Sequence, residues 1–161
     1  MAIQIDVKNE IETDILGGVL VKTLPQSLVV TLSGPLGAGK TRLVQAIASA
    51  SGVPLENIGS PTFVLVKEYQ GEARTIYHFD AYRLRNSDEF FELGADEYFD
   101  ANALSFVEWA EKVQDAVPDD RLDISIQPID ETSRRFTLAT RGDLDSKLEN
   151  EILEQWIRAT K

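Results

Sequence analysis

The residues with the clearest chemistry form a glycine-rich segment that ends in a lysine and a hydroxyl residue. Residues Gly34–Thr41 match the pattern G-x-x-x-x-G-K-[ST] at every fixed position. Glycines let backbone N–H groups approach a curved chain of phosphates, because no Cβ atom stands in the way. Lys40 can neutralise the β- and γ-phosphates, and the Thr41 hydroxyl is a hard oxygen ligand suited to Mg²⁺. The segment predicts a site for ATP or GTP with Mg²⁺.

The surroundings of this segment are those that such a site requires. Residues 28–32 form a short, β-branched apolar run, which indicates a buried strand. A helix is predicted from about Lys40 to Ser51, and its start would point free N–H groups at the phosphates. A chance match to the pattern is expected in roughly 1% of chains of this length. ATP is favoured over GTP, since the chain contains no Asn-Lys-x-Asp motif.

Two acidic residues follow apparent strands. Asp80 comes directly after residues 76–79, and Glu108 directly after residues 104–107. Ligands of open α/β sheets gather at the carboxyl ends of strands. Either carboxylate could therefore hold Mg²⁺ or orient an attacking water, and the alternative for each is a solvated acid.

Other candidates carry weaker signals. Thr62 follows Pro61 in a stiffened loop and could sense the γ-phosphate through Mg²⁺, although the sequence alone favours an ordinary strand entry. His78, the only histidine, is predicted to be packed and hydrogen-bonded rather than catalytic. Arg83 would neutralise phosphate or pair with an acid, and Trp109 would pack near the nucleotide or fill the core.

Composition excludes several classes of protein. The 161 residues contain no cysteine, which removes disulfides and thiolate zinc sites. The net charge of −11 would repel a phosphate backbone, so autonomous, non-specific nucleic-acid binding is not expected. No apolar run reaches membrane-spanning length and the start lacks the pattern of a signal peptide, so the prediction is a cytoplasmic protein without membrane contact.

The alternation of elements predicts one domain over residues 1–161, with a three-layer, P-loop NTPase-like α/β fold and a mixed parallel and antiparallel central sheet. The predicted strands are residues 3–7, 28–32, 63–69, 75–79, 104–107, 122–127 and 135–140. The predicted helices are residues 12–22, 40–51, a short one capped by Ser87 and stopped near Gly94, a stretch reaching Val117, and one from Leu144 onward.

Four segments together resemble the bacterial TsaE family. They are Gly34–Thr41, Ser60-Pro61-Thr62, the run Tyr77–Leu84 and Val107-Glu108-Trp109. Their order and spacing agree with the family, and the resemblance extends from about Glu12 to Gly142. It implies a small Mg²⁺-dependent ATPase needed for threonylcarbamoylation of adenosine in certain tRNAs. The partners implied are TsaD and TsaB, which transfer the threonylcarbamoyl group, while tRNA is met indirectly through the complex.

The resemblance also assigns roles by position. Lys40 would bind phosphates with backbone N–H groups of Gly37, Ala38 and Gly39, while Thr41 and Glu108 would bind Mg²⁺. Asp80 would act at the catalytic centre, Thr62 would be switch-like, and Trp109 would lie beside the nucleotide. Thr13 resembles a nucleotide-contacting position, and Arg134 matches another, although the neighbouring Arg135 leaves that register open. Pro35, Arg42 and Ala110 depart from the family's usual residues, which leaves the hydrolysis rate open.

Two other functions remain as alternatives. A non-catalytic assembly factor would use ATP binding to order the Thr62 loop and create a docking surface. A small-molecule P-loop kinase would need a basic lid, whereas residues 83–122 are rich in acids. As an ATPase, the isolated chain is expected to be weak and stimulated by partners, because Arg83 is the only candidate arginine finger.

Overall fold

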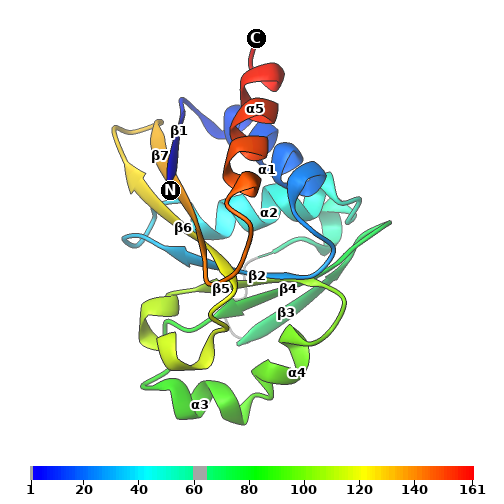
Figure 1. The fold of residues 1–161 in the computed structure, drawn as a ribbon, viewed down its shortest axis with the longest axis vertical. Helices are drawn as coiled ribbons and strands as arrows, with labels where there is room; N and C mark the ends of the chain where they lie inside the picture. Colours follow the sequence, from blue (N-terminus) through cyan, green and yellow to red (C-terminus); the bar gives the residue numbers. More distant parts are fainter. Residues whose placement is uncertain (1, 60–64) are drawn as a thin grey trace.

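The computed structural model describes residues 2–59 and 65–161 and arranges them around one mixed sheet with helices on both faces (Figure 1). The strands are β1 (Ile3–Val7), β2 (Leu28–Ser33), β3 (Val66–Gln70), β4 (Thr75–Asp80), β5 (Leu104–Glu108), β6 (Arg121–Pro128) and β7 (Arg134–Arg141). The α-helices are α1 (Glu10–Thr23), α2 (Lys40–Ala50), α3 (Ser87–Glu92), α4 (Ala95–Phe99) and α5 (Lys147–Ala159). Short 3-10 helices cover Leu55–Asn57, Ala110–Lys112 and Gln114–Ala116.

The strand order is β1-β7-β6-β2-β5-β4-β3, and the centre of the sheet is parallel. β2 pairs in parallel with β5 and β6, and β4 pairs in parallel with β5. The outer pairs β1–β7, β6–β7 and β3–β4 are antiparallel, so the predicted mixed sheet is confirmed. Because β2, β4 and β5 run the same way, their carboxyl ends meet at one edge.

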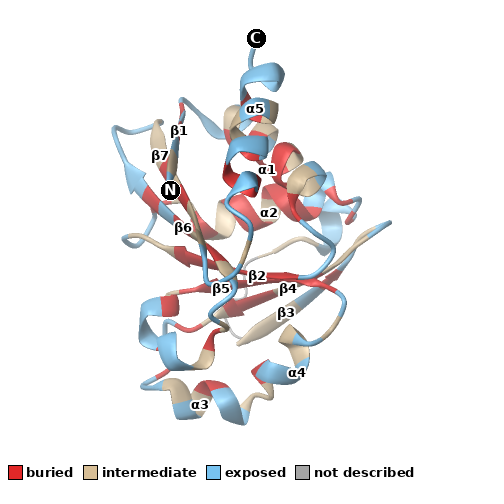
Figure 2. Ribbon diagram, viewed as in Figure 1, coloured by how far each residue is buried: buried red, intermediate tan, exposed pale blue. Residues whose placement is uncertain are grey.

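Two cores, one on each face of the sheet, account for the three layers. α1, α2 and α5 cover one face, where Val30, Leu32 and Phe106 point into the larger core. α3, α4 and the 3-10 helices after β5 cover the other face around Phe79 and Val107. Neighbouring residues of a strand face opposite sides, so β5, buried at all five positions, contributes to both cores. Figure 2 shows this burial concentrated along the central strands.

The helices before and after β2, α1 and α2, form close to where the sequence predicts them. In α2, Leu43, Val44, Ile47 and Ala48 are all buried, as predicted. α1 begins two residues earlier than predicted because Asn9 caps it. The Asn9 side chain accepts a hydrogen bond from the Glu12 N–H at 2.9 Å, and the Glu12 carboxylate accepts one from the Lys8 N–H at 2.7 Å.

The predicted helical stretch to Val117 is wrong. Two 3-10 helices occupy it, after a turn at Trp109. Ala110, Val113 and Val117 are buried at spacings that also suit an α-helix, which explains the misleading pattern.

Smaller corrections concern where helices and strands begin. Asn86, rather than Ser87, caps α3, since its side chain accepts the Glu89 N–H at 3.1 Å. Gly94, in a left-handed conformation, separates α3 from an unpredicted helix, α4. α5 starts at Lys147 rather than Leu144, and β3 starts at Val66; of the predicted strand 63–69, residues 63 and 64 lie outside the described residues.

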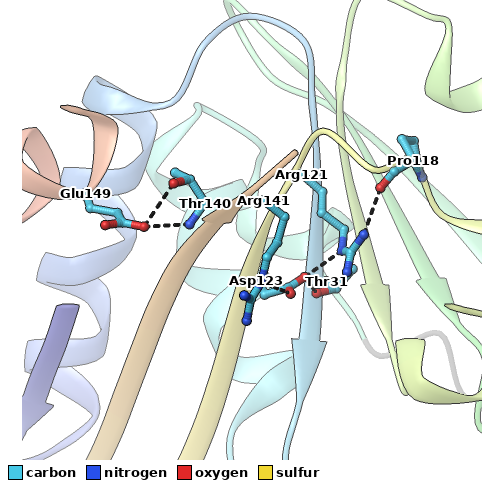
Figure 3. A network of polar contacts seen from close by, with 7 residues as sticks. All are labelled: Thr31, Pro118, Arg121, Asp123, Thr140, Arg141 and Glu149. Carbon is cyan, nitrogen blue, oxygen red and sulfur yellow. Dashed lines mark hydrogen bonds and ion pairs between the residues drawn. The ribbon is translucent and has the colours of Figure 1, made fainter. Parts of the chain in front are cut away.

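Asp123 joins three strands on the face opposite α1 and α2 (Figure 3). One carboxylate oxygen accepts hydrogen bonds from the Thr31 hydroxyl at 2.5 Å and from Arg121 Nε at 2.8 Å. The other oxygen accepts from Arg141 Nε at 2.9 Å. Burial alone would raise the pKa of Asp123, but these three donors outweigh it and hold the pKa below its usual value.

No helix in residues 2–59 or 65–161 is long and apolar enough to cross a membrane.

Replacing Asp123 by Asn should destabilise the protein in a pH-dependent way. The folded-state pKa is lowered, so the charged Asp123 stabilises the fold above the unfolded pKa, and this stabilisation is lost as the pH falls through the folded pKa. At pH 7 we expect the free energy of unfolding to fall by about 2 kcal/mol, measured by urea unfolding. The difference between Asp123→Asn and wild type should shrink below about pH 4. The exposed Asp115→Asn is the control, and a deficit independent of pH would contradict this account.

Adjacent glycines in α1 should respond oppositely to alanine. A Cβ on Gly17 would lie 2.8 Å from both the carbonyl carbon and the Cβ of Ala46 on α2, whereas a Cβ on Gly18 meets nothing within 4 Å. Gly17→Ala should therefore lower the free energy of unfolding by about 1–3 kcal/mol, because the helices must separate. Gly18→Ala should raise it by about 1 kcal/mol through helix propensity. Denaturant unfolding measures both, and equal effects would show that α1 and α2 are not in close contact.

Candidate functional site

The glycine-rich loop between β2 and α2 depends on backbone conformations that favour glycine. Gly34 has φ 146°, and a Cβ there would lie 2.4 Å from the carbonyl oxygen of Ile126. Gly37 and Gly39 have φ values of 80° and 111°, but a Cβ on either would meet nothing within 4 Å. Gly34 is thus required by packing, whereas Gly37 and Gly39 border open space. The Ala38 N–H, predicted to face phosphate, donates to the Pro35 carbonyl at 3.0 Å.

Lys40 is almost completely buried, with 4% of its surface exposed. Its ammonium donates to the carbonyl oxygens of Gly34 at 2.6 Å and Pro35 at 3.0 Å, and lies 4.0 Å from the centroid of the Trp109 ring. Burial lowers the pKa of Lys40, while the nearby carboxylates of Glu108, Glu111 and Asp80 oppose that shift. The loop carbonyls thus stabilise the charged ammonium. A bound anion would compete with these carbonyls for the ammonium group.

The two acids predicted at strand ends lie side by side. Asp80 and Glu108 are register partners at the ends of β4 and β5, and Glu108 also pairs with Leu32 of β2. Glu108 is buried, and its Oε2 accepts a hydrogen bond from the Thr41 hydroxyl at 2.8 Å. Asp80 is half-buried, and its Oδ1 accepts the Tyr82 N–H at 3.0 Å. The neighbouring carboxylates therefore have different surroundings.

Trp109 turns the chain sharply at the end of β5. Among the described residues it is the one non-glycine residue with positive φ, at 59°. This conformation is sparsely populated by side-chain-bearing residues and concentrates at functional sites. Its ring contacts both the Lys40 ammonium and the ring of Tyr82, whose centroid is 5.0 Å away. The turn therefore places an aromatic wall beside the loop lysine.

These groups surround one cavity of about 820 Å³. The predicted site residues that line it are Thr13, Gly37, Ala38, Gly39, Lys40, Thr41, Asp80, Glu108, Trp109 and Arg134. Thr62, the predicted switch residue, lies outside the described residues. The chain therefore brings ten of its candidate residues, drawn from distant segments, to one place.

Side chains alternate between the two sides of β7, and this alternation decides which of Arg134 and Arg135 faces the cavity. Arg134 Nε donates to the carbonyl oxygen of Ala38 in the glycine-rich loop at 3.0 Å. Arg135 points to the other side, where its Nε contacts Asp6 of β1 at 2.8 Å. Arg134 is thus the arginine at the cavity.

Several lining residues were not individually predicted from the sequence as site residues. They are Asn9, Glu10, Ile11, Leu36, Arg42, Tyr82, Glu131, Thr132 and Phe136. The capping pattern of Asn9 and Glu12 could have placed the start of α1 near the loop, and Tyr82 closely follows Asp80. The turn between β6 and β7, which supplies Glu131 and Thr132, has no local signal of a site.

The donor set fits Mg²⁺ bound together with phosphates. Thr41 and Glu108 supply a hydroxyl and a carboxylate, which are hard oxygen ligands. No group of three or more His, Cys, Asp or Glu side chains suited to a metal occurs in the described parts of the chain. A cation here would therefore take most of its ligands from phosphates and water, as Mg²⁺ commonly does.

Comparison with known proteins identifies the family to which this chain is similar. The model of the family described as threonylcarbamoyl adenosine biosynthesis protein TsaE matches residues 7–136. The TsaE protein of Bacillus subtilis (strain 168) is 37% identical over 115 residues, which cover 71% of each chain. That of Treponema pallidum (strain Nichols) is also 37% identical, over 76% of this chain and 90% of its own. The crystal structure of Bacillus subtilis YdiB superposes with a TM-score of 0.76 at 27% identity, covering 100% of this chain and 97% of that one.

Proposed function

The chain belongs to the TsaE family, and we propose that it is the ATP-binding and ATP-hydrolysing component of tRNA threonylcarbamoyladenosine biosynthesis. One observation carries the catalytic part of this proposal. Lys40, Thr41, Asp80 and Glu108 converge on a single cavity above the glycine-rich loop, although they come from three separate segments. This is the combination of phosphate-binding, metal-binding and water-orienting groups that phosphoryl transfer requires.

Binding of ATP would rest on the loop and on the start of α2. The first N–H groups of a helix have no acceptor within the helix, and they carry the positive end of its dipole. Lys40 would exchange the Gly34 and Pro35 carbonyls for phosphate oxygens. Arg134, already at the loop, would add a second positive charge. Mg²⁺, when bound, would neutralise phosphate charge, with Thr41 and Glu108 as its protein ligands.

The different surroundings of the two acids support different roles. Glu108 is buried against the Thr41 hydroxyl, which suits a metal ligand. Asp80 is half-buried, and its carboxylate can accept a further hydrogen bond. In the proposed reaction, Asp80 orients a water whose oxygen bonds to the γ-phosphorus while the bond from that phosphorus to the ADP oxygen breaks. The water's proton passes to Asp80, which releases it to solvent after phosphate leaves.

Partners would complete this site. From its membership of the TsaE family, we propose that the chain acts in the cytoplasm with TsaD and TsaB. We also propose that the isolated chain hydrolyses ATP only weakly. The rim of the cavity exposes Ile11 and Leu36, by 71% and 79%, which is consistent with a surface that another protein covers. The net charge of −11 disfavours direct contact with tRNA, so tRNA would be met through the complex.

The first test is ATP hydrolysis with Mg²⁺, by the chain alone and mixed with TsaB and TsaD. We expect TsaB and TsaD to stimulate ATP hydrolysis by the wild-type chain. We expect no such stimulation with Lys40→Ala. Asp80→Asn should lower turnover by at least about 100-fold, the usual contribution of a general base, while Mg²⁺–ATP binding persists. Glu108→Gln should weaken the dependence of ATP binding on Mg²⁺.

Two results would overturn this mechanism. Full hydrolysis by both Asp80→Asn and Glu108→Gln in the complex would exclude the proposed roles of the carboxylates. If Asp80→Asn bound ATP without hydrolysing it and still supported tRNA modification, the chain would be a non-catalytic assembly factor.

The neighbouring arginines of β7 offer a matched pair. Arg134→Gln should weaken ATP binding by about tenfold, because a charge-assisted contact near the phosphates is lost. Arg135→Gln removes the same charge on the other side of β7, so it should leave the affinity unchanged. Isothermal titration calorimetry at two salt concentrations measures both variants. Equal losses would mean that only the overall charge matters.

A further inference from the structure

We propose that His78 is a positioning residue that holds the Glu108 carboxylate in its metal-binding orientation. This inference rests on the proposed role of Glu108 as a ligand of Mg²⁺. It assigns a task to a side chain that is predicted from the sequence to be packed and hydrogen-bonded, and it explains why a polar ring lies in an apolar core.

His78 lies beneath the site, on β4, and its surface is 0% exposed. Its register partner on β5 is Phe106, two residues before Glu108, so the three side chains share one face of the sheet. That face packs against the core formed with α1 and α2. The ring is thus enclosed by apolar side chains and reaches diagonally toward the end of β5.

Two side chains converge on one oxygen of Glu108. His78 Nε2 lies within hydrogen-bonding distance of Glu108 Oε2, and the Thr41 hydroxyl donates to the same atom at 2.8 Å. Among the described residues, no hydrogen bond involves Oε1 of Glu108. Two bonds from different elements fix the rotamer of the carboxylate and leave its second oxygen available.

The other ring nitrogen identifies the tautomer. Nδ1 of His78 is buried and has no hydrogen-bond partner in the described parts of the chain. A proton on Nδ1 would leave a buried donor unsatisfied and would turn the Nε2 lone pair toward the carboxylate. A proton on Nε2 avoids both penalties. His78 therefore donates from Nε2 to Glu108.

Space-filling alone does not explain these contacts. A buried ring needs at least one polar partner, and among the described residues the carboxylate of Glu108 is the hydrogen-bond partner of His78. If His78 only filled space, an aliphatic side chain would do so without an unpaired nitrogen. Groups that bond a metal-binding carboxylate from behind orient it, and their loss typically weakens metal binding by about 10–100-fold.

The contact can be tested without nucleotide or metal. His78 is the only histidine in the sequence, so a long-range ¹H–¹⁵N spectrum of the ligand-free protein reports on a single imidazole. We expect the proton on Nε2, and we expect Glu108→Gln to shift the Nε2 resonance. A proton on Nδ1, or resonances that ignore Glu108→Gln, would overturn the proposal.

The positioning role is tested by the Mg²⁺ dependence of binding. Calorimetry would compare the affinity for a non-hydrolysable ATP analogue in Mg²⁺ and in EDTA. His78→Leu should reduce the gain from Mg²⁺ by at least about tenfold and leave the affinity in EDTA unchanged. His78→Gln, whose amide can donate from a position close to Nε2, should retain most of the gain. Thermal unfolding would confirm that both variants fold.

The outcomes separate this inference from the proposed function. If Mg²⁺ raises the affinity for the ATP analogue in the wild-type protein and equally in His78→Leu, the positioning role is overturned. The proposed function would then still stand. Losses that are equal in Mg²⁺ and in EDTA would reduce His78 to a structural residue. A wild-type protein whose affinity does not respond to Mg²⁺ would overturn both proposals.

Discussion

The bond between Thr41 at the start of α2 and Glu108 at the end of β5 holds the candidate site together. It exists because β5 runs parallel to and beside β2, so that the carboxyl end of one strand faces the loop that leaves the other. The same register brings Asp80 of β4 alongside Glu108. An antiparallel partner for β2 would put the amino end of that strand beside the loop. The parallel centre of the sheet is thus the constraint on which the chemistry depends, while the antiparallel strands at both edges extend the core.

The site carries features that a fold selected for stability alone would avoid. It buries an ammonium and a carboxylate and keeps a tryptophan in the left-handed region. Each of these features opposes folding. The two buried charges are offset locally, because carbonyl oxygens solvate Lys40, and Thr41 and His78 donate to Glu108. Buried charged groups with specific partners in a cavity are characteristic of functional sites.

The sequence predicted those parts of the fold and site that depend on local patterns. The loop motif and the buried strand before it are contiguous, and Asp80 and Glu108 end short apolar runs, so parallel strands suffice to bring them together. The choice between Arg134 and Arg135 depends on which side of β7 faces the loop. Both are arginines, so composition could not decide it. The prediction of an α-helix after Trp109 failed because the apolar positions there are spaced by three and four residues, which also suits an α-helix. The contact between His78 and Glu108 depends on a diagonal between strands that only the assembled sheet defines.

The state of Lys40 bears on how the proposed nucleotide cycle would run. Its ammonium is satisfied by two carbonyl oxygens of its own loop and by the face of Trp109. Phosphate must displace these contacts, so part of the binding free energy is spent on exchange rather than gained. The Ala38 N–H, engaged with Pro35, would need the same release before it could face a phosphate. A loop whose lysine and N–H group are satisfied internally lowers the affinity for ATP and for ADP alike, and it therefore favours release of the product. Such a balance suits a component that must let go of ADP in every cycle more than one that stores nucleotide.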